Sequence, residues 1–412
     1  MRITSLSVSD RLGGSEVALV GMIGALQRLH PDWRVQVVLP GDGPLRERLR
    51  DTAATCSVVP MPAALAGMGE WSAVADGWSA RSRLALGVQM CSTASVLPAY
   101  ESRLARTVAE FQPDLIHTNG LKAHVLGARL PDQNVPIVWH LHEYISRRRL
   151  TRWLLRRYAS RCSTVIANSS SVATDVTSSL GAWPPVRVVP NSVDLSAFSP
   201  EGPRLDLDRA AGLTPASAGV LRVGLVATYG RWKGHEVFLD AMQRTMHLPH
   251  VRGYIVGGPL YETSDSQLTR RDLQSMIDAR QLTGRVGLTG FVEAAPAMRA
   301  LDVVVHASTE PEPFGLVIAE AMACGRALIT TAYGGAAELI SDGRDALVAE
   351  TGDAGALADA IVTLAGDAEL RGALGGRARE TARLRFAPEA MAAHISEAFE
   401  KTASRPAVAE PA

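Results

Sequence analysis

Cysteine is scarce in this sequence, and long apolar runs are missing. The cysteines Cys56, Cys91, Cys162 and Cys324 show no CxxC spacing, so neither a disulfide framework nor a zinc site is suggested. No uncharged apolar run approaches the roughly 18 residues of a membrane-spanning helix. The chain enters a predicted strand at once, without the charged and apolar segments of a signal peptide. We therefore expect a cytoplasmic protein, with membrane association left open as an alternative.

The sequence also lacks a net charge, because 42 basic and 42 acidic residues cancel. Nucleic acid is therefore not expected as the main partner. The balance hides an asymmetry, since residues 1–190 hold 21 Lys and Arg against 14 Asp and Glu, whereas residues 191–412 hold 21 against 28. We expect the N-terminal half to be the one that meets an anionic acceptor or surface.

Predicted strands and helices alternate along most of the 412 residues, which indicates an α/β protein of two doubly wound domains. Residues 60–100 lack a firm period, and Trp71 and Trp78 stand there among small residues. They are interpreted as a packed helical hairpin, or alternatively as an insertion on the acceptor side. Predicted strands elsewhere include residues 35–40, 114–120, 136–144, 221–230, 303–308 and 327–333.

The most informative stretch runs from His306 to Glu338. A predicted strand ends in a loop that carries Glu312, and a helix is predicted from Leu316. A helix N-terminus offers free backbone N–H groups to an anion, and a carboxylate can accept two hydrogen bonds from a diol. Glu320 follows Glu312 by about two helical turns, so both are expected to face one cleft. Either acid alone could equally be an ordinary cap or a solvated side chain.

Taken together, these residues resemble the donor-sugar motif of the family-4 retaining glycosyltransferases. The resemblance is carried by Glu-x7-Glu, by Phe314-Gly315 after the first glutamate, by Glu-Ala-Met-Ala around the second, and by a following Gly-Gly-x-x-Glu. It implies that Glu312 contacts the hydroxyls of the donor sugar and that Glu320 contacts the nucleotide ribose. It also implies that amides near Gly315 and Leu316 receive the distal phosphate.

Other candidate donor residues lie where residues 221–230 lead into a helix. Two cations, Arg231 and Lys233, suit a diphosphate there, and Lys233 is one of only three lysines in the chain. Lys-Gly resembles the phosphate-clamp lysine of the family. The usual arginine stands about five residues earlier, where this chain has Thr228, so it is open whether Arg231 replaces it. Gly290-Phe291-Val292 resembles the segment that cradles the nucleotide base.

Candidate acceptor residues are predicted in the first half. A glycine pair, Gly13-Gly14, follows the first predicted strand and allows close approach of a phosphate, although a tight turn would also explain it. In this context the pair resembles the GGxE loop of the family, and Gly14 is also a candidate donor contact. His117 at the end of strand 114–120 and Lys122 at the start of the next helix complete the acceptor set.

Two histidines stand at the end of the strand predicted over residues 136–144. Ligands of open parallel sheets gather at the carboxyl ends of strands, although a single histidine there is more often structural. Aligned by this strand, His142 falls where the family has a histidine that touches the donor sugar. We expect His140 to point to the opposite face of the strand and to be structural.

Residues 146–161 contain seven arginines and no acidic residue. Leu150, Trp153, Leu154 and Tyr158 form one apolar stripe at helical spacing. The favoured interpretation is that this stripe packs on the sheet while the arginines lie at the surface. The alternative is that the helix rests on anionic lipid or meets an anionic, lipid-linked acceptor.

The resemblance implies a GT-B fold, with two Rossmann-like domains facing a cleft. Residues 1–189 would bind the acceptor, and the last helix, about 387–402, would cross back onto them. Residues 190–386 would bind the nucleotide sugar, and residues 403–412 are predicted to be disordered. Asp206 and Asp208 form a DxD, which metal-dependent transferases of another fold use, but no predicted strand carries it. We interpret it as surface charge and expect no metal.

The implied reaction moves a hexosyl group, with retention, from a nucleoside-diphosphate sugar to a hydroxyl of a glycan, a lipid-linked molecule or a small molecule. The nucleotide sugar is a substrate, and no cofactor is expected. Arg231 and Lys233 would stabilise the leaving diphosphate, Glu312 would orient the sugar, and His142 would lie near the reacting face. Alternatives are a nucleotide-sugar epimerase, a phosphorylase, or a catalytically silent sugar-binding scaffold.

Overall fold

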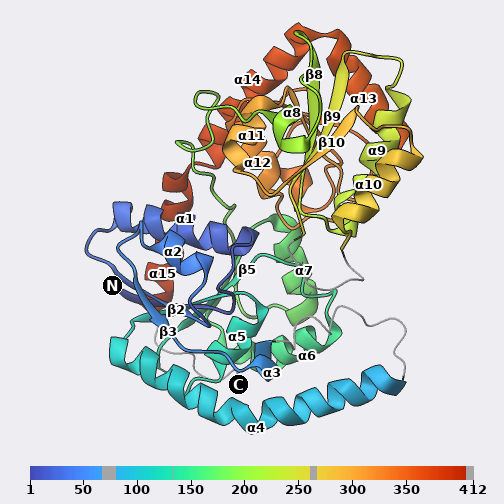
Figure 1. Ribbon diagram of the computed structural model, residues 1–412. Coiled ribbons are helices and arrows are strands. Elements are labelled where there is room, and N and C mark those ends of the chain that lie inside the picture. The colour runs from blue at the N-terminus through green and yellow to red at the C-terminus, as the bar shows by residue number, and fades with distance from the viewer. Residues whose placement is uncertain (67–79, 133, 260–266, 405–412) are drawn as a thin grey trace. The chain divides into compact units, whose positions relative to one another are not determined.

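The computed structural model describes residues 1–66, 80–132, 134–259 and 267–404, and its contacts divide the chain into two α/β units (Figure 1). Unit 1 comprises Met1–Ser192 and Pro388–Ala412, and unit 2 comprises Val193–Ala387. The predicted boundaries, after residue 189 and before residue 387, lie within a few residues of these divisions. The predictions about Trp71, Trp78 and the end of the chain from residue 405 fall outside the described residues.

Unit 1 is built on a seven-stranded parallel sheet of order β3-β2-β1-β4-β5-β6-β7. Its central strands are rich in Val, Ile and Leu and are buried on both faces, as parallel strands covered by helices must be. The order reverses between β1 and β4. The strands are β1 (Arg2–Ser7), β2 (Arg34–Leu39), β3 (Thr55–Val58), β4 (Leu115–Asn119), β5 (Ile137–Leu141), β6 (Thr164–Ala167) and β7 (Val186–Val188).

Helices cover both faces of this sheet. One core joins it to α1 (Gly14–Leu29), α2 (Pro44–Leu49) and α15 (Pro388–Ala403). The other core joins it to α3 (Ala63–Ala66), α4 (Ala80–Phe111), α5 (Leu121–Ala128), α6 (Arg149–Tyr158) and α7 (Ser170–Leu180). The C-terminal helix α15 packs against α1, so the end of the chain returns to unit 1 as the resemblance implied.

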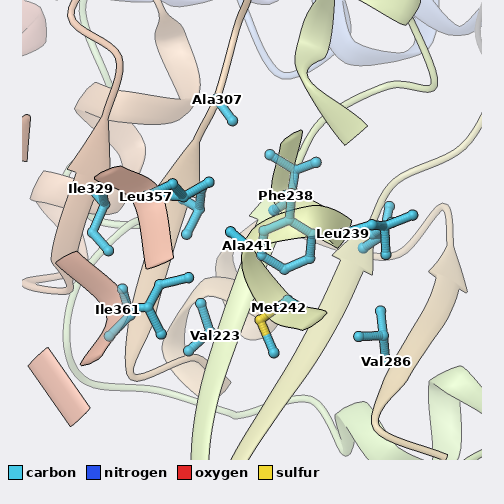
Figure 2. Close-up of a cluster of buried hydrophobic side chains, with 14 of the residues drawn as sticks. Val223, Phe238, Leu239, Ala241, Met242, Val286, Ala307, Ile329, Leu357 and Ile361 are labelled. Atoms are coloured by element: carbon cyan, nitrogen blue, oxygen red, sulfur yellow. The ribbon is translucent and has the colours of Figure 1, made fainter. Parts of the chain in front are cut away.

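Unit 2 has a six-stranded parallel sheet of order β10-β9-β8-β11-β12-β13, which reverses between β8 and β11. The strands are β8 (Leu221–Val226), β9 (Val251–Val256), β10 (Val286–Gly290), β11 (Val303–His306), β12 (Ala327–Thr330) and β13 (Leu347–Val348). Figure 2 shows part of one core, where α9 (His235–Arg244) and α13 (Ala354–Gly366) pack on the sheet. Residues of α10 (Arg270–Ala279) belong to the same core. The opposite face carries α8 (Leu207–Ala211), α11 (Ala294–Ala300), α12 (Leu316–Ala323) and α14 (Ala368–Arg385).

The interpretation of the Asp206–Asp208 pair as surface charge is right for Asp206, which is exposed, and wrong for Asp208. Asp206 caps α8, but Asp208 is buried, and its Oδ1 accepts hydrogen bonds from Arg252 Nη1 at 2.6 Å and Tyr254 Oη at 2.7 Å. Both partners belong to β9. A buried carboxylate is stable when it is paired and hydrogen-bonded, so Asp208 serves to hold α8 on the sheet.

Among the described helices, none combines the length and the apolar character that crossing a bilayer requires.

Candidate functional site

The predicted donor residues of unit 2 meet at the carboxyl edge of its sheet, near the reversal between β8 and β11. Lys233 ends a short 3₁₀ turn, η4 (Arg231–Lys233), which follows β8. Glu312 lies in the loop after β11 and is fixed to the loop after β12: its N–H donates to Tyr333 O at 3.0 Å, and its carbonyl accepts from Gly335 N at 2.7 Å. Such a reversal is where ligands of doubly wound sheets bind.

The side chains of Lys233, Ser308 and His306 contact the Glu312 carboxylate. Lys233 Nζ lies 3.0 and 2.8 Å from its two oxygens, Ser308 Oγ donates at 3.0 Å, and His306 Nε2 lies 3.4 Å away. The side chains of Lys233 and Glu312 are only 21% and 16% exposed. Burial alone would raise the pKa of Glu312, but the charge of Lys233 and the contact with His306 outweigh it and hold this pKa far below its usual range. Glu312 is therefore ionised.

His306 and Ser308 were not singled out from the sequence as site residues. The ring of His306 bridges Thr330 Oγ1, 3.1 Å from Nδ1, and Ser308 Oγ, 3.1 Å from Nε2. The ring of His306 and the hydroxyl of Ser308 therefore help to orient the carboxylate of Glu312. The signal that could have identified them is their position: they are polar residues directly at the end of a buried apolar strand.

Gly234 explains how Lys233 reaches Glu312 although 79 residues separate them. Its φ is +75°, and a Cβ built there would lie 1.9 Å from the carbonyl oxygen of Ala307. Only glycine allows this backbone to approach so closely. The start of α9 therefore packs directly against the end of β11, and Thr309 N donates to Trp232 O at 2.8 Å across the same junction.

Glu320 lies on α12, which begins at Leu316 as predicted, whereas Glu312 lies in the preceding loop. Burial raises the pKa of Glu320 to about 8, so this carboxyl is protonated at neutral pH. The N-cap of α12 is Gly315, in the left-handed region at φ +96°. Phe314 is buried and packs edge-to-face on Phe386, so its ring belongs to the core of unit 2.

The remaining donor candidates line the same edge of the sheet. Arg231 is exposed at the start of the turn that ends in Lys233. Phe291, just beyond β10, is 61% exposed, and its ring lies so close to Gly258 that a Cβ there would be 2.7 Å away. Val292 is partly buried against the core on the α12 face. Phe291 is thus an open aromatic surface, as a base-binding residue needs to be.

In unit 1, Gly13 is the N-cap of α1, and its N–H donates to Glu16 Oε2 at 3.1 Å. A Cβ on Gly14 would meet nothing within 4 Å. Packing among the described residues therefore does not explain glycine at position 14, which stays a predicted point of ligand approach. Lys122 opens α5 close to its predicted position, and its Nζ donates to the carbonyl of Ala66.

Three histidines of unit 1 lie in a row on the face of the sheet that α1 and α15 cover. His117 Nδ1 is 2.9 Å from Ser5 Oγ, His117 Nε2 is 3.2 Å from His140 Nδ1, and the rings of His140 and His142 have centroids 4.1 Å apart. Burial lowers the pKa of His142 to about 4 and that of His117 to about 3, so both are neutral at physiological pH. Both ring nitrogens of His142 are buried without a hydrogen-bond partner among the described residues.

Two expectations about these histidines were wrong. His140 does not point away from His142, because residues two apart on a strand project from the same face. His117 does not lie at the end of its strand but in the middle of β4, where it is fully buried. An acceptor therefore has no direct access to the His117 ring, which lies against Ser5, His140 and Phe399.

Two family models match the chain, one mainly in unit 1 and the other in unit 2. Residues 12–197 match the description Glycosyltransferase Family 4, and residues 219–367 match Glycosyl transferases group 1. Over 253 residues the chain is 32% identical to a D-inositol 3-phosphate glycosyltransferase of Xylanimonas cellulosilytica, covering 59% of this chain and 58% of that one. It is 30% identical over 235 residues to the lipopolysaccharide core biosynthesis glycosyltransferase LpsE of Rhizobium meliloti, covering 57% and 63%. The chain thus matches less than two thirds of either relative.

Solved structures match over nearly the whole chain. The Anabaena protein Alr3699/HepE, solved in complex with UDP-glucose, is 27% identical, with a TM-score of 0.77 over 97% of this chain and 100% of that one. Sucrose-phosphate synthase from Thermosynechococcus elongatus shares the fold at 22% identity, with a TM-score of 0.75 over 97% and 98%. The fold is therefore that of the GT-B proteins.

Proposed function

The chain belongs to the family-4 glycosyltransferases, and from this premise we propose that it moves a hexosyl group from a nucleoside-diphosphate sugar to a hydroxyl acceptor, with retention of the anomeric configuration. The observation that carries the proposal is the Lys233–Glu312 pair. It sets a cation and an ionised carboxylate side by side at the strand-order reversal of unit 2, where ligands of such sheets bind.

Each member of the pair has a partner in the donor. Lys233, with the exposed Arg231, would neutralise the diphosphate, and the oxygens of Glu312 would accept hydrogen bonds from sugar hydroxyls. Without a donor the two side chains satisfy each other, so no charge is left buried and unpaired. Binding of the donor would exchange one set of partners for another, and His306 and Ser308 would keep Glu312 in place throughout.

The proposed chemical step breaks the bond between the anomeric carbon and the diphosphate oxygen, whose electrons leave with the diphosphate. The acceptor oxygen bonds to the anomeric carbon from the same face, and its proton passes to the departing phosphate oxygen. Charge builds up on the diphosphate, which is where Lys233 and Arg231 would act. With these cations in place, we propose that the reaction needs no divalent metal. His142, a neutral ring whose nitrogens have no hydrogen-bond partner among the described residues, would contact the donor sugar.

UDP is the nucleotide that we propose for the donor. The Anabaena relative was solved with UDP and with UDP-glucose, and its likeness covers 97% of this chain. For the acceptor we propose a hydroxyl-bearing molecule with negative charge, since residues 1–190 carry more basic than acidic residues. An inositol phosphate, as in the name of the Xylanimonas relative, has this chemistry.

The donor proposal is tested by thermal shift with UDP, GDP and ADP, with and without EDTA. We expect UDP to raise Tm by mass action, to do so equally in EDTA, and to do so less in the Lys233→Met variant. Glu310→Gln is the matched control, because Glu310 is exposed in the same loop as Glu312. Failure of every nucleotide to raise Tm would refute the donor site, and a UDP effect that EDTA abolishes would refute metal independence.

Retention is tested by NMR of the product formed from UDP-glucose and an inositol phosphate, in which the anomeric configuration is compared with that of the donor. An inverted product contradicts the proposed step. UDP binding without transfer or hydrolysis would favour the silent scaffold, which is supported by Thr228 at the position of the family arginine. An altered nucleotide sugar or free sugar phosphate would point instead to an epimerase or a phosphorylase.

A further inference from the structure

Helix α6 turns its tryptophan outward. Trp153 is 61% exposed and Leu150 is 37% exposed, whereas Leu155 is the fully buried residue of this helix. The predicted packing of the Leu150–Tyr158 stripe is therefore wrong for its two most exposed members. At 100° per residue, Trp153 lies at the centre of the outward face, between Arg149 and Arg157.

The outward face is also strongly basic. Arg149 and Arg157 are exposed, and they form no ion pair within the part of the chain that the structure describes. Residues 146–161 contain no acidic residue of their own. Two acidic side chains near this segment have other partners: Glu143 pairs with Arg148 at 3.1 Å, and Asp175 accepts the N–H groups of residues 145 and 146. The face is thus an uncompensated positive surface around an exposed indole.

The inner side of α6 is held firmly, so the outward face is a stable feature. Leu155 is buried in the core, and α6 packs between α5 and α7. Arg156 Nε donates to the carbonyl of Ser179 on α7, and Tyr158 Oη accepts from Arg129 Nη1 at 2.7 Å. Rotating the helix to bury Trp153 would expose Leu155 and break these bonds.

We propose that this face of α6 docks on an anionic lipid bilayer. Trp153 and Leu150 would enter the interfacial region, where indole rings are favoured, and the arginines would extend their guanidinium groups to the lipid phosphates. A soluble polyanion would satisfy the arginines but would leave the exposed indole and leucine in water. The combination therefore fits a membrane surface better, and α6 would orient unit 1 there irrespective of the transferase activity.

The test is flotation of the full chain with vesicles of phosphatidylcholine, alone or mixed with phosphatidylglycerol. We expect binding to the mixed vesicles only, and weaker binding at high salt. Each of Arg149→Gln and Arg157→Gln should weaken binding about fivefold, since one basic residue near such a surface is worth about 1 kcal/mol. Trp153→Ala should weaken binding as well. In the unchanged chain, brominated lipid should quench the fluorescence of Trp153, and this quenching should be absent in Trp153→Ala.

Matched controls separate this face from general positive charge. The double variant Arg103→Gln, Arg106→Gln removes two exposed arginines from α4, and Leu384→Ala removes a leucine that is 72% exposed on α14. Both should bind vesicles as the unchanged chain does. No binding to anionic vesicles, or equal losses in the controls, would overturn the proposal. A further pair of results would also overturn it: heparin binding that depends on the arginines of α6, and vesicle binding that Trp153→Ala leaves unchanged. The partner would then be a soluble polyanion.

Discussion

At the scale of single residues, the proposed donor site depends on buried groups whose charge states are set by their surroundings. Glu312 is ionised because Lys233 lies within 3.0 Å of both its oxygens, whereas Glu320, which no cation pairs with among the described residues, is protonated at neutral pH. Of two glutamates eight residues apart, one is thus ionised and the other neutral, and the difference comes from their surroundings. The charge state of each has a measurable consequence.

Lys233→Met should lower the free energy of unfolding by about 1–3 kcal/mol, because it leaves the largely buried carboxylate of Glu312 without its cation. Adding Glu312→Gln should recover part of this loss, since a neutral amide tolerates the site better. Urea denaturation of the two single variants and the double variant gives the coupling free energy directly. Additive effects would show that the two side chains do not interact in solution.

Glu320 should make unfolding depend on pH. Its pKa is about 8 in the folded protein against 4.5 in the unfolded chain, so the folded state binds the extra proton between these values. Its contribution to stability therefore falls as pH rises through this window, by at most about 1.4 kcal/mol per pH unit. Glu320→Gln should flatten this dependence in denaturation experiments, while Glu310→Gln should leave it unchanged. An unaltered pH dependence in Glu320→Gln would mean that Glu320 is not the group that titrates.

At the scale of elements, the sequence predicted most of the strands and helices but few of the contacts between them. The helix Leu316–Ala323 and the alternation of strands and helices follow from local patterns of apolar residues. The pairing of Lys233 with Glu312 does not, because it depends on the approach of α9 to β11. The exposure of Trp153 could not be predicted from the sequence either, since amphipathic spacing defines an apolar stripe but not how much of it neighbouring helices cover.

The approach of α9 to β11 can be tested at Gly234. Gly234→Ala should destabilise unit 2 by several kcal/mol and weaken UDP binding, because φ is +75° and the new Cβ would collide with the carbonyl of Ala307. Gly376→Ala is the control: a Cβ there would meet nothing within 4 Å on α14, and alanine should stabilise the helix by about 0.5–1 kcal/mol. Thermal unfolding and UDP titration measure both, and a harmless Gly234→Ala would disprove the close packing.

At the scale of the whole molecule, each unit has its own sheet and its own two cores, and α15 ties the end of the chain to unit 1. Ile395 and Phe399 of α15 are fully buried among residues of α1 and the sheet. Thr402 Oγ1 lies 2.9 Å from Thr164 Oγ1, on β6. Unit 1 is therefore incomplete without residues 388–403, whereas unit 2 is continuous in sequence. A substitution that weakens the packing of α15 should therefore reduce the stability of unit 1 more than that of unit 2.

Phe399→Ala is the variant that tests this asymmetry. It should reduce the stability of unit 1 by about 3–5 kcal/mol, the usual loss for a buried phenylalanine. Tryptophan fluorescence reports mainly on unit 1, because Trp232 is the one tryptophan among residues 193–387. UDP binding, in contrast, would report on unit 2. In a urea titration, Phe399→Ala should move the fluorescence transition to lower urea while UDP binding is lost at the same urea concentration as before. If both transitions moved together, the two units would unfold as one cooperative structure, and the separate stabilities inferred from their contacts would be wrong.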